Sequence, residues 1–583
     1  MGRVSLGRRP KKLLLVIAGG IALIAGVVPA LAAGDTSVPV TVGSPPGPFS
    51  QNKQNEPALA VDASRPWILA AGTNEEIDEE ACNAGDPTTC PFTFGVGVSG
   101  VYFSVDSGKT WTQPTYRGLT ARDCLGPAPC TAHPGPIGTL PGYLEAGLAS
   151  DGDPALAFGP RQGANGKFSW ANGSRLYYAN LTSNLNAKRD ETFKGFEGIA
   201  VSRTDDVAAA AAGQNSAWMA PVVASKQSST TFSDKEQLWA DNAASSPFFG
   251  NVYICYAQFR GQEKSRNAAP APLIMLTSSD GGATWTSLQV SSAANNRNSN
   301  PPDGCTVRTD SHGVVYVFGM GTGPGGQTGE LLSRSFDGGK SFEPFRFLFG
   351  VVKPGVFDAA LGRPVMDGVA GARADLAAAP SVDIANGAPT GSDATNELLI
   401  NWSDARDGRN FEKSMVSFSR DRGQNWSSAA AVSSSPDRPI YTAIAISPNG
   451  TDAYITYDAF LQDYQPNETN PRLMQGVVKH ADIAANGTPI NWTELNRGAA
   501  GDNRGTSQNG LTAEFIGDYV YAVATRTYGS AVWNDARNAG DCPAIDRYRY
   551  SLEGGPAAPR PAPGVDCPAT FGNSDIYGFT SAP

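Results

Sequence analysis

Short runs rich in β-branched and aromatic residues recur along the chain, and turn residues separate them. One group of such runs comprises QLWADN (237–242), GNVYICYAQFR (250–260), LIMLT (273–277) and TSLQVS (286–291). Runs of this length and composition are typical of β-strands. They predict four consecutive strands joined by turns, and the chain's 66 glycines and 43 prolines are ample turn-forming residues.

The four-strand group is repeated. Similar groups begin at Glu56, Asp153, Cys305, Pro380, Thr442 and Phe515, which makes seven groups in all. Their spacing of roughly 40–90 residues is typical of propeller blades. We therefore expect an all-β fold, a single β-propeller of four-stranded antiparallel blades, with seven blades by repeat count and six as the alternative. The run VPVTVG (38–43) has no group of its own, and we expect it to close the ring as the outer strand of the last blade.

The N-terminus has the pattern of an export signal. Five basic residues precede the apolar run LLLVIAGGIALIAGVV, and the small-residue site Ala30-Leu31-Ala32 follows it. An uncleaved anchor is the alternative, because about 20 apolar residues can span a bilayer. We expect residues 1–32 to be a signal peptide, 33–54 an N-terminal segment with the closing strand, and 55–583 the propeller. The mature protein is then secreted, with no stable membrane insertion after cleavage.

The cysteine and histidine content and the net charge limit the kinds of site that the chain can form. The eight cysteines lie as neighbours in sequence, and in an exported chain they predict disulfides, most simply Cys82–Cys90, Cys124–Cys130, Cys255–Cys305 and Cys542–Cys567. The only histidines are His133, His312 and His480, which are far apart in sequence. This scarcity disfavours a zinc site and a Ser-His-Asp hydrolase. The net charge of −10 argues against a nucleic-acid partner.

A second motif marks the turns. The skeleton S-x-D-x-G-x-T-W occurs, with small changes, as SVDSGKTW (104–111), SSDGGATW (278–285), SFDGGKSF (335–342) and SRDRGQNW (419–426). With this Asp-box skeleton, the chain resembles the sialidase superfamily of β-propellers, in which the box caps the hairpin between the third and fourth strands of a blade. An aspartate accepts hydrogen bonds from turn amides, and glycine permits a positive φ. We expect a structural role for the four box aspartates, with calcium binding or catalysis as the alternative.

The box fixes which ends of the strands face a site. If the box hairpins lie at the bottom of the propeller, the starts of the first strands and the ends of the second strands lie at the top, near the central channel. The resemblance implies a tyrosine nucleophile assisted by a carboxylate, and a carboxylic proton donor. The candidate nucleophiles are Tyr519, which lies beside Asp518 in sequence, and Tyr441. The candidate proton donors are Asp153 and Glu56. The alternative is that these acidic residues bind cations or cap strands.

The second-strand ends share a pattern of their own. YAQFR (256–260), WSDAR (402–406) and WNDAR (533–537) place Arg260, Arg406 and Arg537 at equivalent positions. Guanidinium groups bind carboxylates bidentately, and sialidases hold their acid sugar with an arginine triad. We therefore assign these arginines, with Asp404 and Asp535, to substrate binding. The alternative is that each arginine pairs with the Asp two residues earlier and ties one blade to the next. The chain departs from the family in the first blade, where NEPALAV (55–61) has no arginine.

These patterns predict a secreted, sialidase-like glycoside hydrolase that acts on extracellular glycans, such as an exo-α-sialidase or another acid-sugar hydrolase. The alternative is a non-catalytic propeller that binds surface glycans or a protein partner. We expect a monomer that requires no cofactor, and we assign no metal ligands. Structural calcium remains an option, because SDGDP (150–154) clusters carboxylates without the full calcium-loop series. The segments 77–97, 112–150 and 159–174 are expected to be loop insertions.

Overall fold

The computed structural model describes residues 34–43, 45, 47–185, 192–225, 228–261, 271–293, 302–467 and 470–582. The predicted signal peptide therefore lies outside the described residues. No helix among those described has both the length and the apolar character needed to cross a bilayer.

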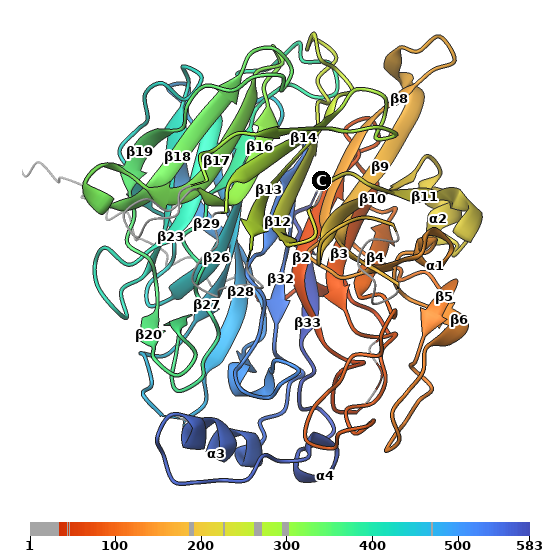
Figure 1. Cartoon of the computed structure of the whole chain (residues 1–583). Coiled ribbons are helices and arrows are strands. Elements are labelled where there is room, and N and C mark those ends of the chain that lie inside the picture. The colour runs from red at the N-terminus through yellow and green to blue at the C-terminus, as the bar shows by residue number, and fades with distance from the viewer. Residues whose placement is uncertain are drawn as a thin grey trace, which may run out of the picture. The chain divides into compact units, whose positions relative to one another are not determined.

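Among the described residues the strands pair into nine antiparallel sheets, seven of which each form one blade (Figure 1). Blade 1 consists of β2 (Gln54–Val61), β3 (Leu69–Glu75) and β4 (Ser99–Ser104). Blade 2 consists of β8 (Ala155–Gln162), β9 (Phe168–Asn184), β10 (Gly198–Thr204) and β11 (Trp218–Val223), with β7 (Leu148–Ser150) beside β9. Blade 3 consists of β12 (Thr231–Ala240), β13 (Val252–Arg260), β14 (Leu273–Ser278) and β15 (Thr286–Gln289), and blade 4 of β16 (Asp303–Thr309), β17 (Val315–Thr322), β18 (Thr328–Ser335) and β19 (Arg346–Gly350).

Blades 5 to 7 follow the same order of strands. Blade 5 consists of β22 (Ser381–Ile384), β23 (Leu398–Asp404), β24 (Lys413–Ser419) and β25 (Ala430–Ala431). Blade 6 consists of β26 (Arg438–Ile446), β27 (Asp452–Phe460), β28 (Leu473–Ile483) and β29 (Pro489–Arg497), with β30 (Gly501–Asp502) beside β28. Blade 7 consists of β31 (Tyr521–Ala524), β32 (Gly529–Asp535), β33 (Asp575–Thr580) and β1 (Val38–Pro39). The predicted seven-bladed, all-β fold is confirmed.

The ring is closed at its innermost strands and at its outer edge. Each first strand contacts the first strand of the next blade, and β31 of blade 7 contacts β2 of blade 1. At the edge, β1 pairs with β33, so the N-terminal segment is the fourth strand of the last blade. Val40 N continues the pairing by donating to Ile576 O at 2.9 Å. The expectation for VPVTVG is thereby confirmed.

The apolar core lies between the blades. Seven clusters of buried side chains each join two neighbouring blades, including one that joins blade 7 to blade 1. The aromatic residue of each box contributes to one of these clusters, as Trp111 does between blades 7 and 1. Burial of apolar surface in these clusters, at about 25 cal/mol per Å², is what holds one blade to the next.

The box aspartates brace their turns. Asp280 Oδ1 accepts hydrogen bonds from the backbone N–H groups of Ala283 and Thr284, each at 3.0 Å, and from Ser278 Oγ at 2.8 Å. Equivalent bonds surround Asp106, Asp337 and Asp421. Burial alone would raise the pKa of Asp337, but these bonds outweigh it and lower the pKa to about 2. The carboxylates are therefore ionised acceptors that satisfy the turn.

Long segments interrupt the regular pattern in three blades. The segment 112–150 contains the hairpin β5 (Tyr116–Thr120)–β6 (His133–Ile137) and α1 (Tyr143–Ala146). The predicted loop 159–174 is instead the end of the β8–β9 hairpin, in which Gln162 pairs with Phe168. Other irregular elements are α2 (Val207–Ala211), β20 (Val356–Asp358), β21 (Arg363–Val365), α3 (Pro543–Leu552), α4 (Pro563–Asp566), and the 3₁₀ turns Asn215–Ala217, Pro324–Gly326 and Asn503–Gly505.

All eight cysteines form disulfides in the predicted sequential pairing. Cys255–Cys305 links the second strand of blade 3 to the first strand of blade 4 and is a covalent tie between blades. Cys542–Cys567 holds the segment that contains α3 and α4, which lie together at the bottom of the view in Figure 1. Disulfides of this kind are typical of exported proteins.

Candidate functional site at the channel mouth

A bulge recurs near the start of the first strand in several blades. In β2, β12, β16 and β26 the pairing register shifts, so that extra residues oppose the second strand. The residues at these bulges have left-handed backbone, with φ of 56° at Glu56, 57° at Lys235, 59° at Gly304 and 49° at Tyr441. Asp153, just before β8, has φ of 50°. A positive φ is unfavourable for residues other than glycine, by about 1–3 kcal/mol each, and such residues gather at functional sites.

The side chains from these bulges meet at one place. Lys235 Nζ lies 2.7 Å from Asp518 Oδ2 and 3.3 Å from both Glu56 Oε1 and Asp153 Oδ2. Arg373 approaches the same carboxylates, with its Nη2 3.0 Å from Glu56 Oε1 and 2.6 Å from Asp518 Oδ2. We call this group, completed by Tyr441 and Tyr519, the channel-mouth cluster. It unites blades 1, 2, 3, 6 and 7 with the segment that precedes β22.

Two carboxyl groups of the cluster have pKa values on opposite sides of the ordinary range. Burial, followed by repulsion from Asp153, raises the pKa of Glu56 to about 8, although Lys235 and Arg373 oppose this. Burial would also raise the pKa of Asp518, but Arg373 and Lys235 outweigh it and lower that pKa to about 2. At neutral pH Glu56 is therefore an acid that can donate a proton, and Asp518 is an ionised base. Carboxyl groups with divergent pKa values are the pattern of an acid–base pair.

The two predicted tyrosines are placed differently. Tyr441 Oη lies 3.2 Å from Asp518 Oδ1, to which it can donate its proton, and it also contacts the carbonyl oxygen of Arg373. Burial, then the charge of Asp518, raises the pKa of Tyr441 well above its usual value. Tyr519 has Lys235 Nζ 5.3 Å from the centroid of its ring. Tyr441 is thus the tyrosine that faces a carboxylate base.

A cavity of about 80 Å³ opens beside the cluster, and Lys235, Tyr441, Asp518 and Tyr519 are among its lining residues. Glu236 also lines it and is only 3% exposed. Neither carboxylate oxygen of Glu236 has a hydrogen-bond partner among the described residues. Burial, then the charge of Asp153, raises the pKa of Glu236 well above its usual range, so this side chain is a second buried carboxylic acid at the cavity.

The predicted arginine set lies at the ends of the second strands, and each arginine binds within its own blade. Asp404 accepts a bond from the indole of Trp402 at 2.8 Å and one from Arg406 Nη2 at 2.6 Å. Asp535 makes the same two contacts with Trp533 and Arg537, at 3.1 and 2.7 Å. In blade 3, Arg260 Nε donates to Gln258 at 3.0 Å. The repeated W-x-D-A-R pattern is thus a local network of tryptophan, aspartate and arginine.

The structure brings together Glu56, Asp153, Tyr441, Asp518 and Tyr519, which the strand-start rule had selected. Of the two cations that organise them, the strand-start rule had included Arg373 but not Lys235. Lys235 lies between two acidic residues, where it has the appearance of a solvated charge. Arg373 comes from the segment between β21 and β22. A signal was available in Lys235, because it occupies the strand-start position that Glu56 and Asp153 occupy in their blades.

The strand pairing defines the chain as a seven-bladed β-propeller with a charged site where the first strands begin. No protein-family model matches the sequence, and neither does any curated protein. Among solved structures, a Hadza microbial sialidase is similar at 13% identity and a TM-score of 0.38, over 70% of this chain and 63% of that one. The chain thus spans just under two thirds of that sialidase.

Two further solved structures are similar to the chain. A Trypanosoma rangeli sialidase, in complex with the inhibitor DANA, matches at 12% identity and a TM-score of 0.40, over 74% of this chain and 58% of that one. A protein of unknown function from Dyadobacter fermentans matches at 13% identity and a TM-score of 0.38, over 76% of this chain and 97% of its own. The fold assignment itself rests on the strand pairing.

Proposed function

We propose that the protein is a secreted, sialidase-like glycoside hydrolase that acts on extracellular glycans, with the channel-mouth cluster as its active site. The observation that carries this proposal is a pair of carboxyl groups beside a tyrosine: Asp518, whose Oδ1 lies 3.2 Å from Tyr441 Oη, and Glu56, whose pKa burial raises. Both contact the same two cations, Lys235 and Arg373. Glycoside cleavage uses two such carboxyl groups, or a tyrosine nucleophile in sialidases.

In this proposal each residue has a defined step. Tyr441 attacks the anomeric carbon and passes its proton to Asp518, whose Oδ1 lies 3.2 Å from the tyrosine oxygen. Glu56 donates its proton to the oxygen of the leaving group. The Glu56 carboxylate then takes a proton from the water that cleaves the bond between the sugar and Tyr441, and Asp518 returns its proton to the tyrosine oxygen. Lys235 and Arg373 hold the two carboxyl groups in place and keep Asp518 ionised. Asp153, whose pKa burial raises, is the reserve proton donor beside them.

In this proposal Arg260, Arg406 and Arg537, at the ends of the second strands, form the rim of the site. Arg406 is the most open of those that pair with an aspartate, with 39% of its side chain exposed against 14% for Arg537. A guanidinium group that binds Asp404 through one edge can offer the other to a carboxylate of the substrate. We therefore assign acid-sugar binding at the rim first to Arg406, and then to Arg260 and Arg537.

A second candidate function, a non-catalytic propeller that binds a glycan or a protein partner, is favoured by one observation. Lys235 occupies the centre of the cluster, and the cavity of about 80 Å³ is smaller than the roughly 300–1,000 Å³ of most ligand sites. In that case the ion pairs of the cluster hold blades together, and a ligand binds to the outer surface.

Turnover measurements on purified protein separate the two functions. The mature chain is assayed against aryl glycosides of neutral, amino and acidic sugars, including a sialoside, together with Tyr441→Phe, Glu56→Gln and Arg406→Ala. If the cluster is catalytic, Tyr441→Phe and Glu56→Gln each lower kcat by at least about 100-fold. Arg406→Ala raises KM for acidic sugars and leaves neutral ones unchanged.

The matched control is Tyr550→Phe, because Tyr550 is a half-exposed residue of α3 that lies outside the cluster. It is expected to retain wild-type rates. If the wild type turns over no glycoside but still binds glycans on an array, the hydrolase proposal is wrong and the binding function takes its place.

A further inference from the structure

Blade 6, like blades 2 and 7, lacks the box that braces the turns of blades 1, 3, 4 and 5, and its strand register places other residues at the equivalent position. In blades 1, 3, 4 and 5 the box serine pairs directly with an apolar residue that begins the second strand, as Ser278 does with Val252 and Ser419 with Leu398. At the same position in blade 6, Asp482 of β28 pairs with Asp452 of β27. The register therefore places two carboxylates directly opposite each other.

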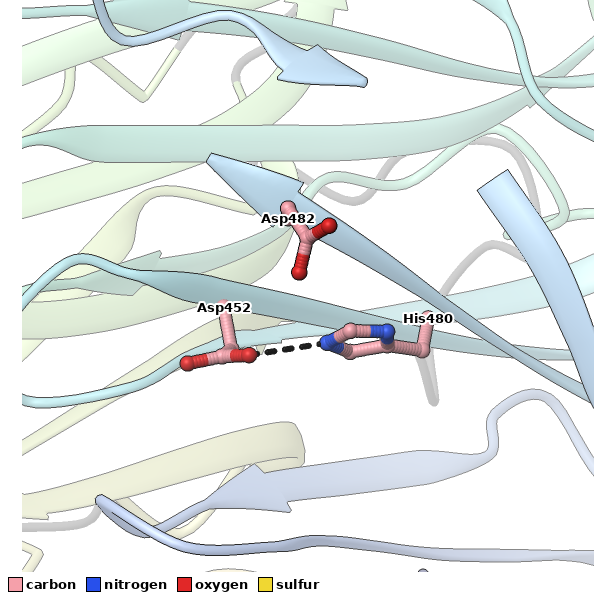
Figure 2. A group of neighbouring side chains, drawn as sticks. All are labelled: Asp452, His480 and Asp482. Carbon is pink, nitrogen blue, oxygen red and sulfur yellow. Dashed lines mark hydrogen bonds and ion pairs between the residues drawn. The ribbon is translucent and has the colours of Figure 1, made fainter. Parts of the chain in front are cut away.

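A histidine completes this group. His480 lies two residues before Asp482, so both side chains are on the same face of β28. Its Nε2 is 2.9 Å from Asp452 Oδ1. One ligand atom from each of Asp452, His480 and Asp482 lies within 4.8 Å of the others. Figure 2 shows the three side chains together, with a carboxylate oxygen of Asp482 directed toward the other two.

The charges of this group are not balanced by protein cations. Among the described residues, no lysine or arginine lies within ion-pair distance of Asp452 or Asp482, and His480 is the partner of Asp452. Like charges directly opposite each other on neighbouring strands are destabilising. A divalent cation between them would remove this repulsion and tie β27 to β28, the second and third strands of blade 6.

Neighbouring residues hold the ligands in position. Thr451 Oγ1 donates to Asp452 Oδ2 at 2.6 Å, which leaves Oδ1 directed toward His480. The ring of His480 packs on that of Tyr454, with centroids 4.9 Å apart. Metal-ligand side chains are commonly oriented by such outer contacts.

We propose that Asp452, His480 and Asp482 bind a divalent first-row transition metal, Zn²⁺ or Mn²⁺, that braces the hairpin of blade 6. Zinc binds imidazole and carboxylate at about 2.0–2.2 Å, which places its ligand atoms roughly 3–3.5 Å apart. The three ligand atoms, which lie within 4.8 Å of one another, would have to approach by side-chain rotation. The imidazole selects against Ca²⁺, which takes oxygen ligands. The site lies at the box end of blade 6, on the face opposite the channel-mouth cluster, and is independent of the proposed hydrolase.

Titration calorimetry on the metal-stripped full chain tests the site, with Zn²⁺, Mn²⁺ and Ca²⁺ in separate titrations. The wild type is expected to bind one equivalent of Zn²⁺ or Mn²⁺ more tightly than Ca²⁺. His480→Gln and Asp482→Asn are each expected to weaken that binding by at least about tenfold. His133→Gln is the matched control, because His133 forms an exposed pair with Asp123 elsewhere on the surface, at 2.9 Å. It is expected to bind like the wild type.

A stability measurement keeps the test decisive if a variant folds poorly. The same excess of Zn²⁺ is expected to raise the Tm of the wild type and of His133→Gln by a few degrees, and to raise that of Asp482→Asn less. Asp482 is exposed, so its substitution by Asn should not prevent folding. The proposal is overturned if the wild type binds neither Zn²⁺ nor Mn²⁺, if it prefers Ca²⁺, or if Asp482→Asn binds the metal and is stabilised as strongly as the wild type.

Discussion

Lys235 determines the charge balance of the channel-mouth cluster. Its side chain is only 10% exposed and lies within 3.3 Å of three carboxylates from blades 1, 2 and 7. Burial by itself would lower the pKa of Lys235, but Asp153, Asp518 and Glu56 outweigh it and raise the pKa well above its usual value. The neighbouring carboxylates therefore favour the charged form of the lysine.

Replacing Lys235 by Met should destabilise the protein in a pH-dependent way. Breaking a buried ion pair on one side costs about 3–5 kcal/mol, because the remaining charge is left in the interior. The loss should be larger at pH 8.5 than at pH 5, since Glu56 and Asp153 can take up protons at the lower pH. Calorimetric Tm values at both pH values measure this, with exposed Lys340→Met as control. If Lys235→Met and Lys340→Met lower the Tm by the same small amount at both pH values, Lys235 does not determine the charge balance of the cluster.

The sequence predicted the members of this cluster unevenly, for a physical reason. Strand order alone brings Glu56, Asp153 and Asp518 to one face, because every blade repeats the same direction of strands. The bulge in each first strand then decides which side chain points to the channel, and a bulge adds a residue without a distinctive sequence pattern. The strand-start position covers Lys235 as well as its neighbours Asp234 and Glu236, but the choice of Lys235 over them depends on the bulge.

At the scale of elements, β1 is short but protects a whole sheet edge. It pairs with β33 through Val38 and Pro39, and Val40 is fully buried between blades 7 and 1. Asp35 anchors the segment by accepting from Arg537 Nη1 at 2.9 Å and from Ala499 N at 3.0 Å. Without this strand, the N–H and C=O groups at the edge of β33 would be open to another chain.

A chain that begins at Gly43 should lose stability and self-associate. Removing residues 34–42 exposes the edge of β33 and part of an inter-blade core, and exposed edges pair with other chains. We expect a Tm lower by several degrees and concentration-dependent oligomers in light scattering. A chain that begins at Gly34 is the control and should stay monomeric with the wild-type Tm. If the chain that begins at Gly43 is monomeric and has the same Tm as the chain that begins at Gly34, β1 does not protect the edge of β33.

Elements with a local sequence pattern were predicted well, whereas those with long-range partners were predicted unevenly: the pairing of β1 with β33 was expected, and others were not. The box turns follow from eight consecutive residues, so their position in blades 1, 3, 4 and 5 was readable. The extended β8–β9 hairpin was taken for a loop because Gly163, Gly166 and Gly173 interrupt its apolar pattern. The pairing of Asp452 with Asp482 was not predicted either, since it depends on a register between strands 30 residues apart in sequence.

At the scale of the whole molecule, many carboxyl groups are buried. Burial raises the pKa of Glu75, Asp151 and Asp241 to about 7 each, and that of Glu56 to about 8. Below the ordinary carboxyl pKa of about 4, these groups are protonated in both the folded and the unfolded chain. Between about pH 4 and 8 the unfolded chain releases their protons while the folded chain keeps them. The free energy of unfolding therefore falls as the pH rises through this window.

The opposite contribution comes from Asp337 and Asp518, whose pKa values of about 2 make them stabilising above about pH 4 and less so below it. We therefore expect the Tm to be highest near pH 4–5 and to fall by several degrees toward pH 8.5.

Asp241→Asn should flatten part of that fall, because Asp241 is fully buried and its neutral replacement has no proton to lose. Exposed Glu145→Gln is the control and should keep the wild-type slope. Scanning calorimetry from pH 4 to 9 at constant ionic strength gives the slopes. A Tm that rises steadily to pH 8.5 would mean that the buried carboxyl groups are ionised in the folded protein, which would also remove Glu56 as the proton donor.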